Sequence, residues 1–172
     1  MRAEDAEMVA SLCAARAGLH VDPDKTYLLE TRLSTILREH KVAGLSGLAD
    51  ILRQPGPHAV KDKVVDAMTT NETTFFRDQH PFELLRGILL PRLLELRASE
   101  RRLRIWSAAC STGQEAYSLA MLLRHHFPRL ADWDVRIVGS DLSSDAVARA
   151  REGRYTQLEV GRGLPATMLA SY

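Results

Sequence analysis

Three charged side chains could bind a polar ligand, and two of them lie in short segments at 71–78 (NETTFFRD) and 104–121 (RIWSAACSTGQEAYSLAM). Arg77 can bind a carboxylate through two parallel charge-assisted hydrogen bonds, which a lysine does not reproduce. Glu115 can receive an ammonium group, and Asp141 can accept hydrogen bonds from ribose hydroxyls. Structural interpretations stay open for each of them: an exposed surface arginine, a partner of a helix macrodipole, and a helix cap.

The second segment is predicted to form a strand, a tight turn and a helix. Leu103, Ile105 and Trp106 form a short apolar run with a β-branched and an aromatic member, and residues 107–113 are small. Apolar residues then recur every three or four positions over 114–127, as in a helix. Such a turn leaves unpaired backbone N–H groups at the helix start. Its only glycine is Gly113, so the G-x-G-x-x-G fingerprint is missing and a pyrophosphate is not the favoured ligand.

A second strand is expected over 135–138, followed by Gly139, Ser140 and Asp141. In doubly wound nucleoside-binding folds, an acidic residue after the second strand accepts hydrogen bonds from the ribose hydroxyls. Asp141 is at that position, with helix capping as its alternative role. Ser143 or Ser144 is expected to cap the next helix.

The part of the chain before Asn71 has helical spacing throughout. We expect helices around 8–17, over 22–43 with Asp22-Pro23 as the start, over 48–52 and over 59–68, with a break at 54–57. Gly18 and Gly44 are the expected stops. The apolar face of the second helix is assigned to Tyr27, Leu29, Leu33, Ile36 and Leu37. A connecting helix is expected over 81–97, bent or divided at Gly87 and Pro91.

Composition is that of an ordinary globular protein, with 172 residues, 45% apolar and 26% charged. The part before Asn71 has 9 basic and 10 acidic residues, and the remainder has 14 and 12, so no nucleic-acid partner is expected. No apolar run of about 18 residues and no signal peptide is seen, so a cytoplasmic location without membrane insertion is expected. Cys13 and Cys110 lie far apart and predict neither a disulfide framework nor a metal site.

The two motif segments, together with the later DLSSDAVARAREGRY and RGLPATML, resemble the CheR chemotaxis receptor methyltransferases. The similarity runs from Tyr27 to Tyr172. It implies S-adenosyl-L-methionine (SAM) as the cofactor, with S-adenosyl-L-homocysteine as its product. It also implies a glutamate on the cytoplasmic helices of a methyl-accepting chemotaxis receptor as the acceptor. The positions that it assigns to the cofactor are Asn71, Thr73, Arg77, Ala109, Glu115, Asp141 and Leu142.

The chemistry implied by this resemblance needs little acid or base help, because a glutamate with a pKa of about 4.3 is already ionised at neutral pH. The enzyme must instead align nucleophile, methyl group and sulfur, and exclude water. Arg77 is the expected catalytic residue, since its guanidinium can also orient the incoming glutamate. The resemblance further implies that the helical module docks on the receptor through Lys25, Arg32 and Arg38, with Lys41 following. A solvated helix face is the alternative for each of these cations.

We therefore predict an α/β fold with an N-terminal helical domain over 1–70, a motif loop and connecting helix over 71–100, and a partial SAM-binding domain over 101–172. The last domain is expected to be the front part of a doubly wound, Rossmann-like sheet. Two strands leave that sheet incomplete, which predicts pairing of two copies or a segment swap. Two other functions stay open: a non-catalytic SAM- or receptor-binding module, and a nicotinamide-dependent oxidoreductase, which the single turn glycine disfavours.

Overall fold

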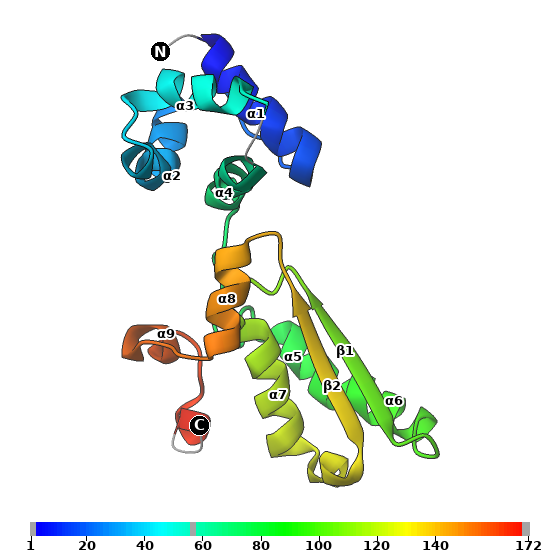
Figure 1. Ribbon diagram of the computed structural model, residues 1–172. Helices are drawn as coiled ribbons and strands as arrows, with labels where there is room; N and C mark the ends of the chain where they lie inside the picture. Colours follow the sequence, from blue (N-terminus) through cyan, green and yellow to red (C-terminus); the bar gives the residue numbers. More distant parts are fainter. Residues whose placement is uncertain (1–2, 56–57, 170–172) are drawn as a thin grey trace. The chain divides into compact units, whose positions relative to one another are not determined.

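The computed structural model describes residues 3–55 and 58–169 (Figure 1). Backbone contacts divide the chain into two compact units, one up to Thr70 and one from Asn71 onward. Each unit has its own buried core and is described separately below. In the described ranges, no helix combines the length and the apolar character needed to cross a membrane.

The first unit consists of four helices in the described residues: α1 (Ala3–Ala17), α2 (Thr26–Glu39), α3 (Gly44–Arg53) and α4 (His58–Met68). They enclose one apolar cluster, in which Val9, Leu33, Leu48 and Val64 are fully buried. The α1 helix stops at the predicted place, because Gly18 adopts a left-handed φ of 65° and its N–H donates to the carbonyl of Ala14 at 3.0 Å.

Three details of the α2 prediction are wrong. The helix begins at Thr26, because Asp22 accepts a hydrogen bond from the N–H of Asp24 at 3.0 Å and closes a local turn before it. Gly44 does not stop α2 but begins α3, with a φ of 76°. Tyr27 is 69% exposed, whereas Leu29 is buried as predicted. Residues two positions apart in a helix are separated by about 200° around the helix axis, so these two side chains lie on opposite faces.

The described part of the second unit alternates helices with two strands. Its elements are α5 (His80–Leu84), the π-helical η1 (Leu85–Leu89), α6 (Leu90–Leu96), β1 (Arg102–Ala108), α7 (Gln114–His126), the 3₁₀ turn η2 (Pro128–Asp132), β2 (Asp134–Ser140), α8 (Ser144–Glu152), α9 (Gln157–Gly161) and α10 (Ala166–Leu169). The predicted connecting helix therefore exists and is divided near Gly87 and Pro91. The N–H of Leu90 donates to the carbonyl of Leu85, five residues back, which is the π-helical pattern.

The two strands are parallel and pair in register, with Ile105 opposite Ile137 and Trp106 opposite Val138. One face of the sheet packs on α6 and α7 in an apolar cluster that includes Leu94, Leu103 and Leu122. Figure 1 shows α7 running beside β2. Trp106 belongs to the apolar run of the expected strand, yet it is 71% exposed on the opposite face. This arrangement confirms the predicted incomplete, Rossmann-like sheet.

Candidate functional site

Three segments that are distant in sequence meet at Ser111. Its backbone N–H donates to Asp141 Oδ2 at 2.7 Å, and its hydroxyl donates to the carbonyl of Asn71, also at 2.7 Å. Ser111 is buried, with 6% of its surface exposed. The motif loop 71–78, the turn 107–113 and the residue after β2 are therefore held together by one serine at the carboxyl end of the parallel strands. That edge is where doubly wound folds bind their ligands.

The motif loop is anchored by its two phenylalanines, Phe75 and Phe76. Phe75 is 4% exposed, and its ring meets Tyr155 edge-on with centroids 5.0 Å apart. The N–H of Phe76 donates to the hydroxyl of Ser118 on α7 at 2.9 Å. The Phe76 ring packs edge-on against Phe82 at 5.1 Å. These contacts fix the loop to α5, to α7 and to the segment that follows α8.

Left-handed backbone at non-glycine residues is concentrated in and next to these two loops. The residues concerned are Phe76, Asp78 and Gln79 in and after the first loop, and Ala109 and Ser111 in the turn, with φ between 38° and 62°. Elsewhere in the described ranges, such angles occur at Lys41 and Arg101. This conformation is costly for residues with a Cβ, and it clusters at ligand-binding sites because the surrounding contacts enforce it.

The predicted ribose acceptor, Asp141, is half-buried and fixed by two backbone donors. Oδ2 accepts from Ser111, and Oδ1 accepts from the N–H of Ser143 at 2.9 Å. The cap of α8 itself is Ser143, whose hydroxyl accepts from the N–H of Ala146 at 3.2 Å. Each carboxylate oxygen keeps further acceptor capacity, so Asp141 can still receive hydroxyl donors.

The other predicted cofactor residues differ in exposure. Glu115 is exposed at the start of α7, and its Oε1 accepts from the hydroxyl of Ser107 at 2.6 Å. Arg77 is exposed, and its guanidinium donates to the carbonyl of Glu72 at 2.6 Å, within its own loop. Ala109 and Leu142 are exposed, whereas Asn71 and Thr73 are half-buried.

The carboxylates of Asp141 and Glu115 both act electrostatically on the turn, through Cys110. Burial raises the pKa of the Cys110 thiol, and the charges of Asp141 and Glu115 raise that pKa further. The two carboxylates therefore act on the same side chain from different elements. The thiol is also a poor nucleophile, because only its thiolate form attacks. A Cβ added at Gly139 would lie 2.9 Å from the Cys110 sulfur, so the cysteine fills a tightly packed place.

A cavity of about 460 Å³ lies beside the motif loop, between α7, α8 and α9. Its lining residues are Asn71, Glu72, Thr73, Thr74, Thr112, Gln114, Asp145, Ala146, Arg149, Glu159 and Arg162. Two predicted cofactor residues, Asn71 and Thr73, belong to this lining. Sequence reasoning missed Arg149 and Glu159, which form an ion pair, although Thr156-x-x-Glu159 is a recognisable capping box.

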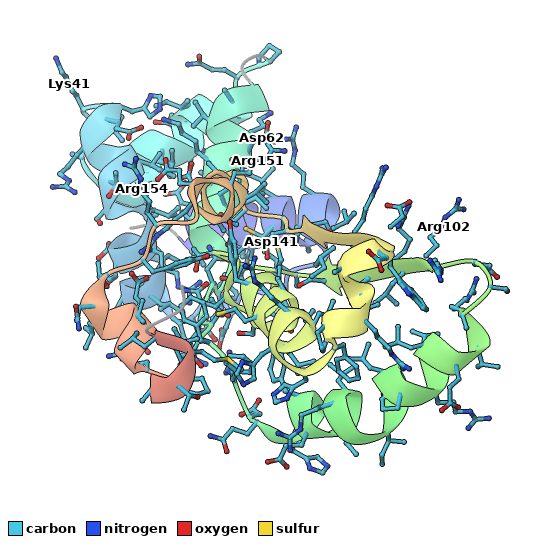
Figure 2. All side chains as sticks on the ribbon, turned by 90° about the horizontal axis from the view of Figure 1, so that it is seen from below. Lys41, Asp62, Arg102, Asp141, Arg151 and Arg154 are labelled. Carbon is cyan, nitrogen blue, oxygen red and sulfur yellow. The ribbon has the colours of Figure 1, made fainter. Side chains whose placement is uncertain are left out.

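The predicted docking cations of the first unit differ in availability. Arg32 donates to the carbonyls of Met68 and Thr69 at 2.7 and 2.9 Å, so it caps the end of α4. Lys25 forms a long ion pair with Asp22 at 3.7 Å. Lys41 is exposed and extends away from the helices of its unit (Figure 2).

Both units match models of one protein family. Residues 4–69 match the CheR methyltransferase all-alpha domain, and residues 71–172 match the CheR methyltransferase SAM binding domain. Chemotaxis protein methyltransferase 1 of Pseudomonas aeruginosa is 39% identical over 98% of this chain and 62% of its own length. Chemotaxis protein methyltransferase Cher2 of Pseudomonas putida is 35% identical over 90% of this chain and 57% of its own length. Chemotaxis protein methyltransferase 1 of Vibrio cholerae is 40% identical over 87% of this chain and 54% of its own length. The chain thus spans 54–62% of the length of these three relatives.

Proposed function

This chain belongs to the CheR methyltransferase family, and we propose that it serves SAM-dependent O-methylation of glutamate side chains on methyl-accepting chemotaxis receptors. Its match to the SAM binding domain indicates SAM as the cofactor, as the sequence predicted. The relatives named above support a role in chemotaxis. The acceptor glutamate, the receptor and a cytoplasmic setting are parts of the proposal.

The observation that carries this proposal is the meeting of the motif loop, the turn and Asp141 at Ser111. Their side chains match the chemical groups of SAM. Asp141 keeps acceptor capacity for a ribose diol, and the exposed carboxylate of Glu115 suits an ammonium group. Leu142, at 57% exposed, offers apolar surface for an adenine ring. Ala109, in the turn, is exposed and has a left-handed φ of 62°.

Arg77 is proposed as both the carboxylate-binding residue and the residue that orients the acceptor. One guanidinium nitrogen of Arg77 donates to the neutral carbonyl of Glu72. A charged carboxylate would accept stronger hydrogen bonds from the same group. When bound, SAM supplies the methyl group on a sulfonium. The chain's own contribution is then alignment of the acceptor and exclusion of water, because an ionised glutamate needs no general base.

The first unit is proposed as the receptor-docking surface. Lys25, Arg38 and Lys41 are exposed and suit an acidic partner. Arg32 has a different role in this proposal, because its capping of α4 fixes α2 against α4 and thereby supports that surface. Substituting Arg32 should therefore lower the stability of the unit, whereas substituting Lys41 should lower receptor affinity alone.

The function is tested by titrating S-adenosyl-L-homocysteine into the chain and into Arg77→Ala. We expect at least about tenfold weaker binding for this variant, since it loses a bidentate charged contact. Arg92→Ala, which removes an exposed arginine of α6, is the matched control and should bind like the parent. Equal affinity of Arg77→Ala and the parent would show that Arg77 does not bind the cofactor carboxylate. A preference for NAD over S-adenosyl-L-homocysteine would contradict SAM as the cofactor.

A second candidate is a non-catalytic SAM- or receptor-binding module. Transfer of labelled methyl groups from SAM to receptor glutamates separates the two functions. Cofactor binding without any transfer would select the module for these 172 residues.

A further inference from the structure

We infer that Tyr155 is a positioning residue that joins the motif loop 71–78 to the turn 107–113 and so sets the geometry of the cofactor site. The inference rests on the proposed function, because the two loops form the proposed SAM site. Tyr155 follows α8 and belongs to neither loop. It touches both of them through different parts of one side chain.

The hydroxyl of Tyr155 is bonded to the turn. It donates to the carbonyl of Thr112 at 2.7 Å, directly before the glycine that leads into α7. That glycine, Gly113, has a φ of 99°, and a Cβ added there would lie 2.8 Å from the Tyr155 oxygen. The phenol therefore fits closely against the backbone of the turn. Burial is the main cause that raises the Tyr155 pKa to about 12, so the hydroxyl keeps the proton that it donates.

The ring of Tyr155 is packed against the motif loop. It meets the Phe75 ring edge-on, with centroids 5.0 Å apart and an angle of 79° between the planes. Both side chains belong to an apolar cluster with Met121 and Met168. Edge-on aromatic pairs of this kind hold their partners in a defined relative orientation. Tyr155 thus fixes one loop by packing and the other by a hydrogen bond.

A neighbouring tyrosine provides a matched control. Tyr117 lies 5.8 Å from Tyr155 between ring centroids, and its hydroxyl also donates to a backbone carbonyl, that of Ala150 at 2.9 Å. This bond joins α7 to α8 and involves neither loop. Tyr117→Phe and Tyr155→Phe therefore remove the same chemical group from two rings in contact, but only the second releases the turn.

Amide hydrogen exchange, thermal melting and titration with S-adenosyl-L-homocysteine test the inference on the 172-residue chain and both variants. For Tyr155→Phe, we expect faster exchange over 107–113 and an affinity roughly fivefold lower, in line with one lost hydrogen bond. The melting temperature should stay close to that of Tyr117→Phe. Tyr155→Leu, which also removes the ring, should extend the faster exchange to 71–78. Tyr117→Phe should leave exchange in both loops and the affinity unchanged.

Unchanged exchange over 107–113 together with unchanged affinity in Tyr155→Phe would overturn the inference. Equal effects of Tyr155→Phe and Tyr117→Phe would also overturn it, because both tyrosines would then only support general stability. Failure of the proposed function gives a different result. If the parent chain does not bind S-adenosyl-L-homocysteine, the exchange rates of the two loops alone decide whether Tyr155 joins them.

Discussion

Replacing Gly163 by alanine should displace the motif loop. Gly163 follows α9, and a Cβ built on it would lie 2.0 Å from the carbonyl oxygen of Phe75. Carbon–oxygen contacts are normally about 3.3 Å or longer, so either backbone segment must move by roughly 1 Å. Phe75 is 4% exposed and is held by Tyr155. The loop therefore cannot give way without losing its anchor.

The expected cost follows from two contributions. Overpacking at a well-packed place costs about 1–3 kcal/mol. The φ of 153° at Gly163 is unfavourable for alanine and adds about 1 kcal/mol. A loss of about 3 kcal/mol in a unit of this size should lower the melting temperature by roughly 10–20 °C. Affinity for S-adenosyl-L-homocysteine should fall as well, because Arg77 follows Phe75 in the same loop.

Thermal melting and calorimetry on the parent and on two glycine variants measure these effects. Gly161→Ala is the control, because nothing lies within 4 Å of its added Cβ and the residue is helical. Alanine is favoured over glycine in helices by about 0.8–1 kcal/mol, so this variant should melt at or above the parent temperature. If Gly163→Ala melts and binds like Gly161→Ala, the close contact with the motif loop does not exist.

Three further predictions concern charged groups. Arg77→Lys should bind S-adenosyl-L-homocysteine about tenfold more weakly than the parent by calorimetry, because an ammonium group cannot form the bidentate contact; full retention would refute that contact. The pKa of Glu159 is lowered by hydrogen bonds from the backbone and hydroxyl of Thr156 and by the charge of Arg149. Its contribution to stability is therefore complete above about pH 4.3 and is lost as the pH falls through the lower folded-state pKa. Melting curves from pH 6 to 3 should fall less steeply for Glu159→Gln, and parallel curves would contradict this. Asp5→Ala should destabilise the first unit by about 2–4 kcal/mol in denaturant titrations, because this fully buried carboxylate accepts from Ser46 and Arg53; a change below about 0.5 kcal/mol would show that the buried carboxylate is not structural.

Local patterns predicted the second unit well because its elements have strong periodic signals. The expected strand at 103–106 is the centre of β1, and the expected helix from Gln114 is α7, which ends one residue earlier than predicted. The helical spacing that begins after the run of small residues marks this boundary. Ser143 as the cap of α8 follows from the same local chemistry. These features depend on residues within a few positions of each other.

Features that depend on distant residues were missed. Trp106 lies in an apolar run, but the run does not say whether anything covers the second face of the sheet. Gly44 looks like a helix stop because glycines often follow helices, yet its left-handed φ begins α3. The bonds of Ser111 reach 40 residues back to Asn71 and 30 residues forward to Asp141, and no spacing rule predicts such pairs.

We propose that the motif loop, the turn and Asp141 bind one SAM molecule together. An NMR titration of the isotope-labelled 19.2 kDa chain with S-adenosyl-L-homocysteine tests it most directly. The amide signals of 71–78, 107–113 and 139–143 should shift together and fit a single dissociation constant. Shifts confined to one of these segments, or absent from all three, would contradict it.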